Sequence, residues 1–243
     1  GGDDILIGGD AGTDRNHGGM GWDWITYYGN RSNITADWAF NRVFEPNNPL
    51  PSRFDLLEAM SGGSGNDTLR GPIANPDDLA PSEIELNKAT EESLARIDGL
   101  IEMLRPTVEG GAGNPVALGD VALPFLRGAP ESDSDGVHKI FIGGPGNDII
   151  EGRGGNDYLD GDKMLRVRLT DGTNFYDSAA EVRARVFDGT LNPGALDIVR
   201  DIVDDPNAAE SVDTAFYRNN FDAYTITPLG PLGSGYWRVE HTQ

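Results

Sequence analysis

The chain contains no cysteine among its 243 residues. This absence excludes disulfide bonds, thiolate metal sites and cysteine nucleophiles together. Histidine is also scarce. We interpret each of the three, His17, His138 and His241, as a surface residue, because none lies in a helical pattern. The sequence has no G-x-S-x-G, H-E-x-x-H or P-loop motif either, so we expect the chain itself not to be an enzyme.

Basic residues are few: 19 Lys and Arg stand against 40 Asp and Glu, which gives a formal net charge of -21. Such a surface repels phosphates, which argues against a nucleic acid partner, and it equally disfavours an anionic membrane surface. No apolar run reaches the ~20 residues needed to span a bilayer. Clustered carboxylates attract cations and repel one another, so we expect metal binding and folding to be coupled.

Glycine, by contrast, is abundant, and much of it falls in a nine-residue pattern, G-G-x-G-x-D-x-U-x, in which U is a large apolar residue. Copies occupy residues 18–26, 62–70, 143–151 and 152–160, and the last two are back to back. A weaker copy lies at 12–16, and residues 2–6 are the second half of another. An isolated copy could be an ordinary Gly-Asn-Asp turn, but six copies in phase indicate a structural repeat.

Each position of the pattern has a separate physical role. Glycine permits positive φ and lets backbone carbonyls crowd around an ion. Aspartate supplies the hard anionic oxygen that calcium prefers, and the apolar residue begins a short strand that points into the core. The predicted carboxylate ligands are Asp4, Asp14, Asp23, Asp67, Asp148 and Asp157. The glycines predicted to bring their backbone to the ions are Gly19, Gly21, Gly63, Gly65, Gly144, Gly146 and Gly155.

The repeats divide the chain into four predicted parts, and the whole is expected to be mainly β. Residues 1–71 hold repeats followed by degenerate strands, and residues 143–162 continue the repeats. Residues 72–142 are predicted to be an insertion with one amphipathic helix. Residues 163–243 are predicted to hold a strand over 163–171, two short helices and terminal strands.

Helix signals occur in the two parts that lack repeats. In the insertion, a capping box that begins at Ser82 precedes a stripe of apolar residues spaced three, four and three apart. This stripe predicts one helix packed against the repeats, through Leu94, Ile97, Ile101 and Leu104. Further on, a capping box at Ser178 starts a helix that Gly189 should end, and Asn192-Pro193 predicts a second short helix. The buried face of this last helix would consist of Leu196, Val199 and Val203.

On these motifs the chain resembles bacterial RTX, or hemolysin-type, calcium-binding proteins. The resemblance implies a right-handed parallel β-roll, export by type I secretion and several calcium ions, each held between loops stacked on one side of the roll. Since one coil takes two repeats, a site needs loops from repeats n and n+2. The loops ending in Asp4 and Asp23 would then share an ion, and the loop ending in Asp148 would pair with Gly161-Asp162. The loops ending in Asp67 and Asp157 would pair if the insertion bulges out of the roll.

A more particular resemblance rests on residues 155–169, 192–200 and 213–217, which look like segments of large bacterial proteins with an animal-type heme peroxidase domain and RTX repeats. A heme peroxidase needs a proximal histidine ligand on a mainly helical scaffold. None of the three histidines has that setting. The resemblance therefore implies that any peroxidase active site lies outside this chain.

Together these observations predict a non-catalytic calcium-binding module of a secreted or cell-surface bacterial protein, whose partners are calcium ions and the rest of its parent polypeptide. Residue 1 falls in the middle of a repeat, so we expect an internal part of a longer chain. Two alternatives stay open. The chain could be a structural part of a secreted heme peroxidase, or an adhesin-type module. The adhesin would bind a ligand through exposed aromatic residues, although packing within the strands is the simpler interpretation of Trp22, Trp24, Trp38 and Trp237.

Overall fold

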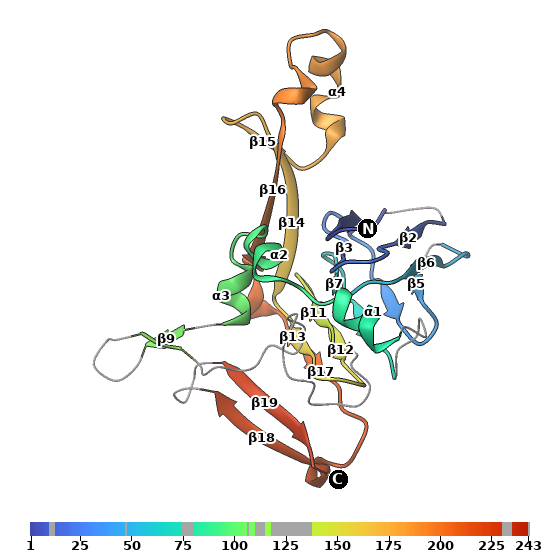
Figure 1. Cartoon of the computed structure of the whole chain (residues 1–243), viewed down its shortest axis with the longest axis vertical. Coiled ribbons are helices and arrows are strands. Elements are labelled where there is room, and N and C mark those ends of the chain that lie inside the picture. Colours follow the sequence, from blue (N-terminus) through green and yellow to red (C-terminus); the bar gives the residue numbers. More distant parts are fainter. Residues whose placement is uncertain are drawn as a thin grey trace.

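The structure is a computed structural model, and it describes residues 1–9, 13–46, 48–73, 80–105, 107–109, 115–117, 138–229 and 235–242. The chain is mainly β, with a few short helices. Figure 1 shows a central stack of short strands, from which a long two-stranded arm projects on one side and a hairpin on the other. None of the described helices is long and apolar enough to cross a membrane.

Two sheets form the central stack. In the first sheet all neighbouring strands are parallel, and each strand is three residues long. In spatial order its strands are β1 (Ile5–Ile7), β3 (Trp24–Thr26), β7 (Ala59–Ser61), β11 (Ile140–Ile142) and β13 (Tyr158–Asp160). The second sheet contains, in spatial order, β17 (Thr214–Ala215), β12 (Ile149–Glu151), β8 (Thr68–Arg70), β4 (Thr35–Asp37), β5 (Arg42–Phe44), β6 (Ser52–Asp55) and β2 (Arg15–His17).

The chain passes from one sheet to the other at nearly every strand. The exception is the run β4, β5 and β6, an antiparallel meander that stays in the second sheet and separates β2 from β4. A strand of three residues has one central side chain on one face and two flanking side chains on the other. The side chains of the two faces are therefore buried against different parts of the protein.

The central side chains meet between the two sheets. Ile25, Met60 and Phe141 of the first sheet pack with Leu69 and Ile150 of the second in one buried cluster. These are the apolar positions of the repeat or their equivalents. The repeat therefore places its large apolar residue in the core, as the sequence pattern predicts.

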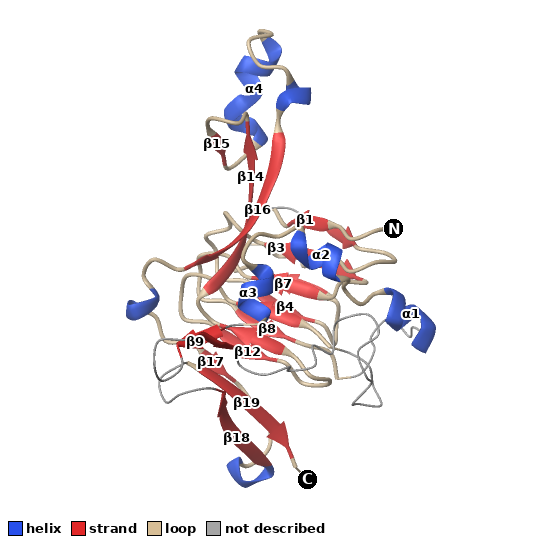
Figure 2. Ribbon diagram, turned by 60° about the vertical axis from the view of Figure 1, so that its left-hand side comes forward, coloured by secondary structure: helices blue, strands red, loops and turns tan. Residues whose placement is uncertain are grey.

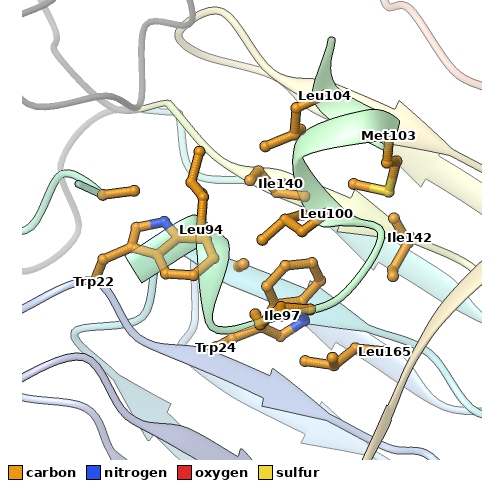
Figure 3. Close-up of a cluster of buried hydrophobic side chains, with 12 residues drawn as sticks. Trp22, Trp24, Leu94, Ile97, Leu100, Met103, Leu104, Ile140, Ile142 and Leu165 are labelled. Atoms are coloured by element: carbon orange, nitrogen blue, oxygen red, sulfur yellow. The ribbon is translucent and has the colours of Figure 1, made fainter. Parts of the chain in front are cut away.

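The flanking side chains of the first sheet face outward and form a second buried cluster with the insertion (Figure 3). Trp24, Ala59 and Ile140 lie there under Leu94 and Leu100. The insertion therefore packs on the repeats, as expected from its apolar stripe. The insertion has three short helices instead of one, α1 (Pro81–Leu86), α2 (Glu91–Ala95) and α3 (Leu100–Leu104), and of these α2 and α3 contribute to the buried cluster.

The predicted single helix is wrong because Gly99 breaks it. Gly99 precedes α3 with φ of 78°, a left-handed conformation that ends a helix. The expected capping box is also shifted, since α1 begins at Pro81 and the Glu83 carboxylate accepts a hydrogen bond from the Ala80 backbone N–H at 2.8 Å. The insertion continues with an antiparallel pair, β9 (Thr107–Glu109) and β10 (Pro115–Ala117). Residues 110–114 and 118–137 of the expected insertion lie outside the described residues.

The arm consists of β14 (Lys163–Thr170) and β16 (Asp197–Asp204), which pair antiparallel along their whole length. At its tip lie β15 (Phe175–Tyr176) and α4 (Ala179–Phe187), as Figure 2 shows. The strand predicted over 163–171 and the helix that begins after Ser178 are confirmed. The base of the arm contacts the stack, where the hydroxyl of Thr26 in β3 donates a hydrogen bond to the carbonyl of Leu165 in β14 at 2.8 Å.

The second predicted helix of this part is wrong. Residues Pro193–Ala195 form a single 3₁₀ turn, capped by the Asn192 side chain, and β16 follows. The spacing of Leu196, Val199 and Val203 fits a helix, but the segment is rich in β-branched residues and pairs with β14. Beyond the arm, β18 (Tyr224–Leu229) and β19 (Tyr236–His241) form the hairpin near the C-terminus, which agrees with the terminal strands predicted there.

Candidate calcium-binding loops

The turns between the two sheets form two columns, one on each side of the stack. The first column holds turns that lead from the first sheet to the second, including 62–67 and 143–148. The second column holds turns that lead back, including 18–23 and 152–157. Asp148 precedes β12 of the second sheet, whereas Asp157 precedes β13 of the first. The two adjacent repeats therefore put their aspartates on opposite sides.

In the first column three aspartates form a ladder. The Asp148 Oδ1 accepts a hydrogen bond from the Asp67 backbone N–H at 2.6 Å, and the Asp213 Oδ1 accepts from the Asp148 N–H at 2.7 Å. The Asp67 Oδ1 continues the ladder by accepting from the Ile34 N–H at 2.8 Å. Each carboxylate thus reaches the backbone of the coil before it.

An asparagine ladder runs beside the aspartates, one residue earlier in each turn. The Asn33 Oδ1 accepts from the Asn66 N–H at 2.9 Å, and the Asn66 Oδ1 accepts from the Asn147 N–H at 3.0 Å. The Asn147 Oδ1 accepts in turn from the Val212 N–H at 2.7 Å. These contacts fix the turns in register and occupy only one carboxylate oxygen of Asp148, whose Oδ2 is left without a hydrogen-bond partner.

The first glycine of each turn lies directly against that second oxygen. A Cβ added to Gly62 would lie 2.3 Å from Asp67 Oδ2, and one added to Gly143 would lie 2.3 Å from Asp148 Oδ2. Gly144 and Gly146 have φ of 96° and 141°, and their missing Cβ atoms would fall 2.5 Å and 2.1 Å from the carbonyl oxygens of Gly63 and Gly65. Carbonyl and carboxylate oxygens therefore converge where turns 62–67 and 143–148 meet.

A third turn of this column comes from two distant parts of the sequence. A Cβ added to Gly161 would lie 2.2 Å from Asp213 Oδ2, the same relationship that Gly143 has to Asp148. The whole arm is inserted between Gly161-Asp162 and Asp213. Sequence reasoning identified Asp162 and missed Asp213, because the arm separates it from its glycines and no large apolar residue follows it. The only local signal is that Asp213 directly precedes a short β segment.

Asp162 lies at the base of the arm, next to this turn. The Gly143 N–H donates to the Asp160 carbonyl at 2.8 Å and the Gly144 N–H donates to the Gly161 carbonyl at 2.9 Å. Turn 143–148 and Gly161-Asp162 are therefore neighbours, as predicted. The Asp162 Oδ1 accepts from the Ser211 hydroxyl at 3.1 Å, which closes the arm at its base.

Burial makes the charge of these aspartates costly. It raises the pKa of Asp148 to about 8, helped by the neighbouring charges of Asp67, Asp213 and Asp162. Burial also raises the pKa of Asp67 to about 6. The Asp148 Oδ2 is buried without a hydrogen-bond partner, and an ionised carboxylate in that state needs a compensating positive charge.

A calcium ion fits this requirement. It takes six to eight oxygen ligands and accepts backbone carbonyls alongside carboxylates. Within the described residues, no three His, Cys, Asp or Glu side chains come together as a cluster that could hold an ion by themselves. Carbonyl oxygens of the turns would therefore complete the shell around Asp67, Asp148 and Asp213.

The second column has a similar arrangement at its N-terminal end. The Asp23 Oδ1 accepts from the Asp4 N–H at 2.8 Å, and the Asp23 N–H donates to the Glu58 carboxylate at 2.8 Å. The loops of Asp4 and Asp23 are therefore neighbours, as predicted. Gly19 and Gly21 both have positive φ, and Gly21 packs against the Gly2 carbonyl. The Asp23 Oδ2 is buried without a partner, and burial raises the pKa of Asp23 to about 6.

The predicted pairing of Asp67 with Asp157 is wrong. Asp67 lies in the first column, whereas Asp157 lies in the second, where its Oδ1 accepts a hydrogen bond from the Lys139 N–H at 2.9 Å. The prediction failed because it did not include β11, which no Gly-Asp motif precedes. The chain returns to the first sheet at β11, and Asp148 therefore lies on the same side of the stack as Asp67. Asp14 is also separated from the other predicted ligands. Its N–H donates to the Ser52 hydroxyl at 3.2 Å, since the meander lies between β2 and β4.

The remaining predicted glycines differ among themselves. Gly155 has φ of 90°, whereas Gly63 and Gly65 do not have positive φ. The Gly63 N–H instead donates to the Asp67 Oδ2 at 2.6 Å. Turn 62–67 thus has a different backbone from 143–148, although both carry the same sequence pattern.

Burial separates the histidines and tryptophans that lie at the surface from those within the stack. His17 and His241 are exposed, but His138 is buried, and its Nδ1 accepts from the Asn156 N–H at 2.9 Å. His138 is therefore not the surface residue we predicted. Three of the four tryptophans are buried, and the fourth, Trp237, is 58% exposed. Packing within the stack accounts for Trp22, Trp24 and Trp38.

Stacked parallel strands joined by Gly-Asp turns define a class of proteins built from short repeats. The family model of the RTX calcium-binding nonapeptide repeat matches residues 59–71 and 140–163, with four copies. The chain therefore carries RTX repeats, and the matched segments contain turns 62–67, 143–148 and 152–157. No curated protein and no solved structure matches the chain.

Proposed function

We propose that the chain is a calcium-binding β-roll module of a secreted bacterial protein, and that turns 62–67, 143–148 and the split turn of Gly161 and Asp213 are its principal calcium loops. The observation that carries the proposal is the Asp148 carboxylate. It lies at the centre of the aspartate ladder, and its second oxygen is buried without a partner. A divalent cation would offset most of the negative charge that it shares with its neighbours Asp67 and Asp213.

We propose further that calcium switches the fold on outside the cell. Extracellular calcium modules bind at roughly 10⁻⁴–10⁻³ M, which is far above cytosolic levels. The net charge of -21 opposes compaction until cations bind. The module would then stay loose during export, and would order and stiffen the attached domains afterwards.

Calorimetric titration of the chain with calcium, paired with circular dichroism, tests both proposals. We expect binding of several ions and a gain of β structure on going from excess chelator to millimolar calcium, with magnesium much less effective. The variant Asp148→Asn should lose at least one ion. An equally ordered spectrum in chelator and in calcium would exclude the coupling of metal and fold.

We also propose that the module is not catalytic itself. The positions of the histidines support this proposal. His138 accepts a hydrogen bond from the backbone of a turn, and His17 and His241 are exposed residues of β2 and β19. Adding heme to the chain should give no Soret shift above that of free heme. A ligated-heme spectrum would contradict this proposal.

A further inference from the structure

Turn 152–157 departs from the other repeats at its second position. Gly19 and Gly144 hold that position in their turns, with φ of 97° and 96°, but here it is Arg153, with φ of 68°. A side chain rarely adopts such a left-handed conformation without compensation from its surroundings. The contacts of the Arg153 side chain show what compensates.

The Arg153 guanidinium is buried and bound on several sides. Its Nη1 and Nη2 lie 2.8 Å and 3.1 Å from the two carboxylate oxygens of Asp37, and its Nε lies 3.2 Å from Glu151 Oε2. The Nη1 also donates to the Gly71 carbonyl at 3.1 Å. The Arg153 side chain is 8% exposed, and those of Asp37 and Glu151 are 9% and 5% exposed. Two carboxylates and a carbonyl thus converge on one fixed positive charge, a set of oxygens that would also suit a cation.

A second fixed cation stands in the aspartate position of the preceding coil. Register places Ile140 beside Ala59 and Tyr158, so Lys139 occupies the same row as Glu58 and Asp157. The buried Lys139 ammonium donates to the Leu57 carbonyl at 2.6 Å and lies 3.8 Å from the Glu58 carboxylate. The Lys139 ammonium therefore supplies a fixed positive charge next to the Glu58 carboxylate, at a position where the calcium-type turns carry an aspartate.

The neighbours of turn 152–157 also differ from those in the first column. Gly71 packs against the Gly152 carbonyl, and the Gly154 N–H donates to the Pro72 carbonyl at 3.0 Å. In the described part of the chain, the adjoining backbone on the preceding coil is 71–73 and 138–139, and neither segment contains the Gly-Gly-x-Gly-x-Asp pattern. Turn 152–157 therefore does not stack there on a second calcium-type loop.

We propose that Arg153 and Lys139 take the place of calcium at turn 152–157, so that repeat 152–160 matches the RTX pattern but folds around built-in cations and binds no calcium. The inference rests on the proposed function, because it separates the calcium loops of the first column from a metal-independent turn in the second. It distinguishes two kinds of turn that share one sequence pattern, one that binds calcium and one that does not.

The first test compares Asp157→Asn with Asp148→Asn in the full chain, and counts bound calcium by calorimetric titration. We expect Asp148→Asn to lose at least one ion and Asp157→Asn to keep the wild-type number. Loss of an ion in both variants would overturn the inference and leave the proposed function standing. No calcium binding by the wild-type chain would overturn the proposed function, and the inference with it.

The second test uses Arg153→Gly, which restores the repeat's own glycine and removes the backbone strain. We expect its melting temperature to fall by the same amount at every point of a calcium titration, because the lost charge is not replaced by an ion. For Asp148→Asn, in contrast, the deficit should grow as calcium rises. A melting temperature of Arg153→Gly equal to wild type throughout would overturn the inference. Should this variant fail to fold, the ion count of Asp157→Asn decides.

Discussion

Gly161 and Asp213 belong to one turn although the whole arm lies between them in the sequence. A Cβ on Gly161 would lie 2.2 Å from the Asp213 carboxylate, as a Cβ on Gly143 would lie 2.3 Å from that of Asp148. The arm is thus inserted inside a repeat and not between repeats. Calcium at this turn would join the base of the arm to the stack.

This relationship predicts that Asp213 contributes to calcium binding as Asp148 does. Asp213→Asn keeps the hydrogen bond to the Asp148 N–H but removes a charge, so we expect calcium affinity to fall roughly tenfold, about 1.4 kcal/mol. Titration calorimetry checks this. Asp222→Asn, at an exposed position near the hairpin, is the matched control and should bind like wild type. Equal affinity of the two variants would rule out a role for Asp213.

The raised pKa of Asp148 predicts an inverted pH dependence without calcium. Its folded-state value of about 8 lies above the unfolded value of 3.8, so its stabilising contribution is complete below 3.8 and is lost as pH rises toward 8. In chelator, the chain should therefore be more ordered near pH 5 than near pH 8. Calcium should reverse the trend, since it binds the ionised form. Circular dichroism across pH measures this, and Asp148→Asn should flatten part of the slope in chelator.

The first glycine of each calcium turn should not tolerate a side chain. Gly143→Ala would place a Cβ 2.3 Å from Asp148 Oδ2 and 2.7 Å from the Gly161 carbonyl, so we expect a loss of stability of about 1–3 kcal/mol together with weaker calcium binding. Gly194→Ala, whose nearest contact is the Asn192 side chain at 3.4 Å, is the control and should change little. Denaturant unfolding in saturating calcium gives both values, and similar losses in the two variants would contradict the proposed crowding.

The insertion should stabilise the stack through its apolar contacts. Leu100 is fully buried beside Trp24 and Ile140, so Leu100→Ala should destabilise the protein by about 2–5 kcal/mol. Leu86, which is 48% exposed at the end of α1, provides the control, and its change to alanine should cost less than about 0.5 kcal/mol. Chemical unfolding monitored by tryptophan fluorescence would show the difference. A negligible effect of Leu100→Ala would mean that the insertion does not support the first sheet.

Much of the local structure was predictable because its causes are local. Ser178 and Glu181 form the capping box of α4, and Gly189 adopts positive φ just beyond it. The failures share a reason too. The apolar spacing from Leu94 to Leu104 fits a continuous helix, but Gly99 adopts a left-handed conformation and interrupts it. The spacing from Leu196 to Val203 also fits a helix, but this segment pairs with β14 as a strand.

The sequence by itself determined where the turns and the core positions lie, because the glycines, the aspartate and the apolar residue two places after it are all fixed within nine residues. Only the tertiary structure decided which turns meet. Asp148 lies between Asp67 and Asp213, and not beside Asp157, because β11 adds a crossing without a Gly-Asp signal and because the arm interrupts a turn. Two turns lie on the same side of the stack when the chain passes between the sheets an even number of times from one to the other. Every strand that takes the chain into the other sheet contributes to that number, whether or not the motif precedes it.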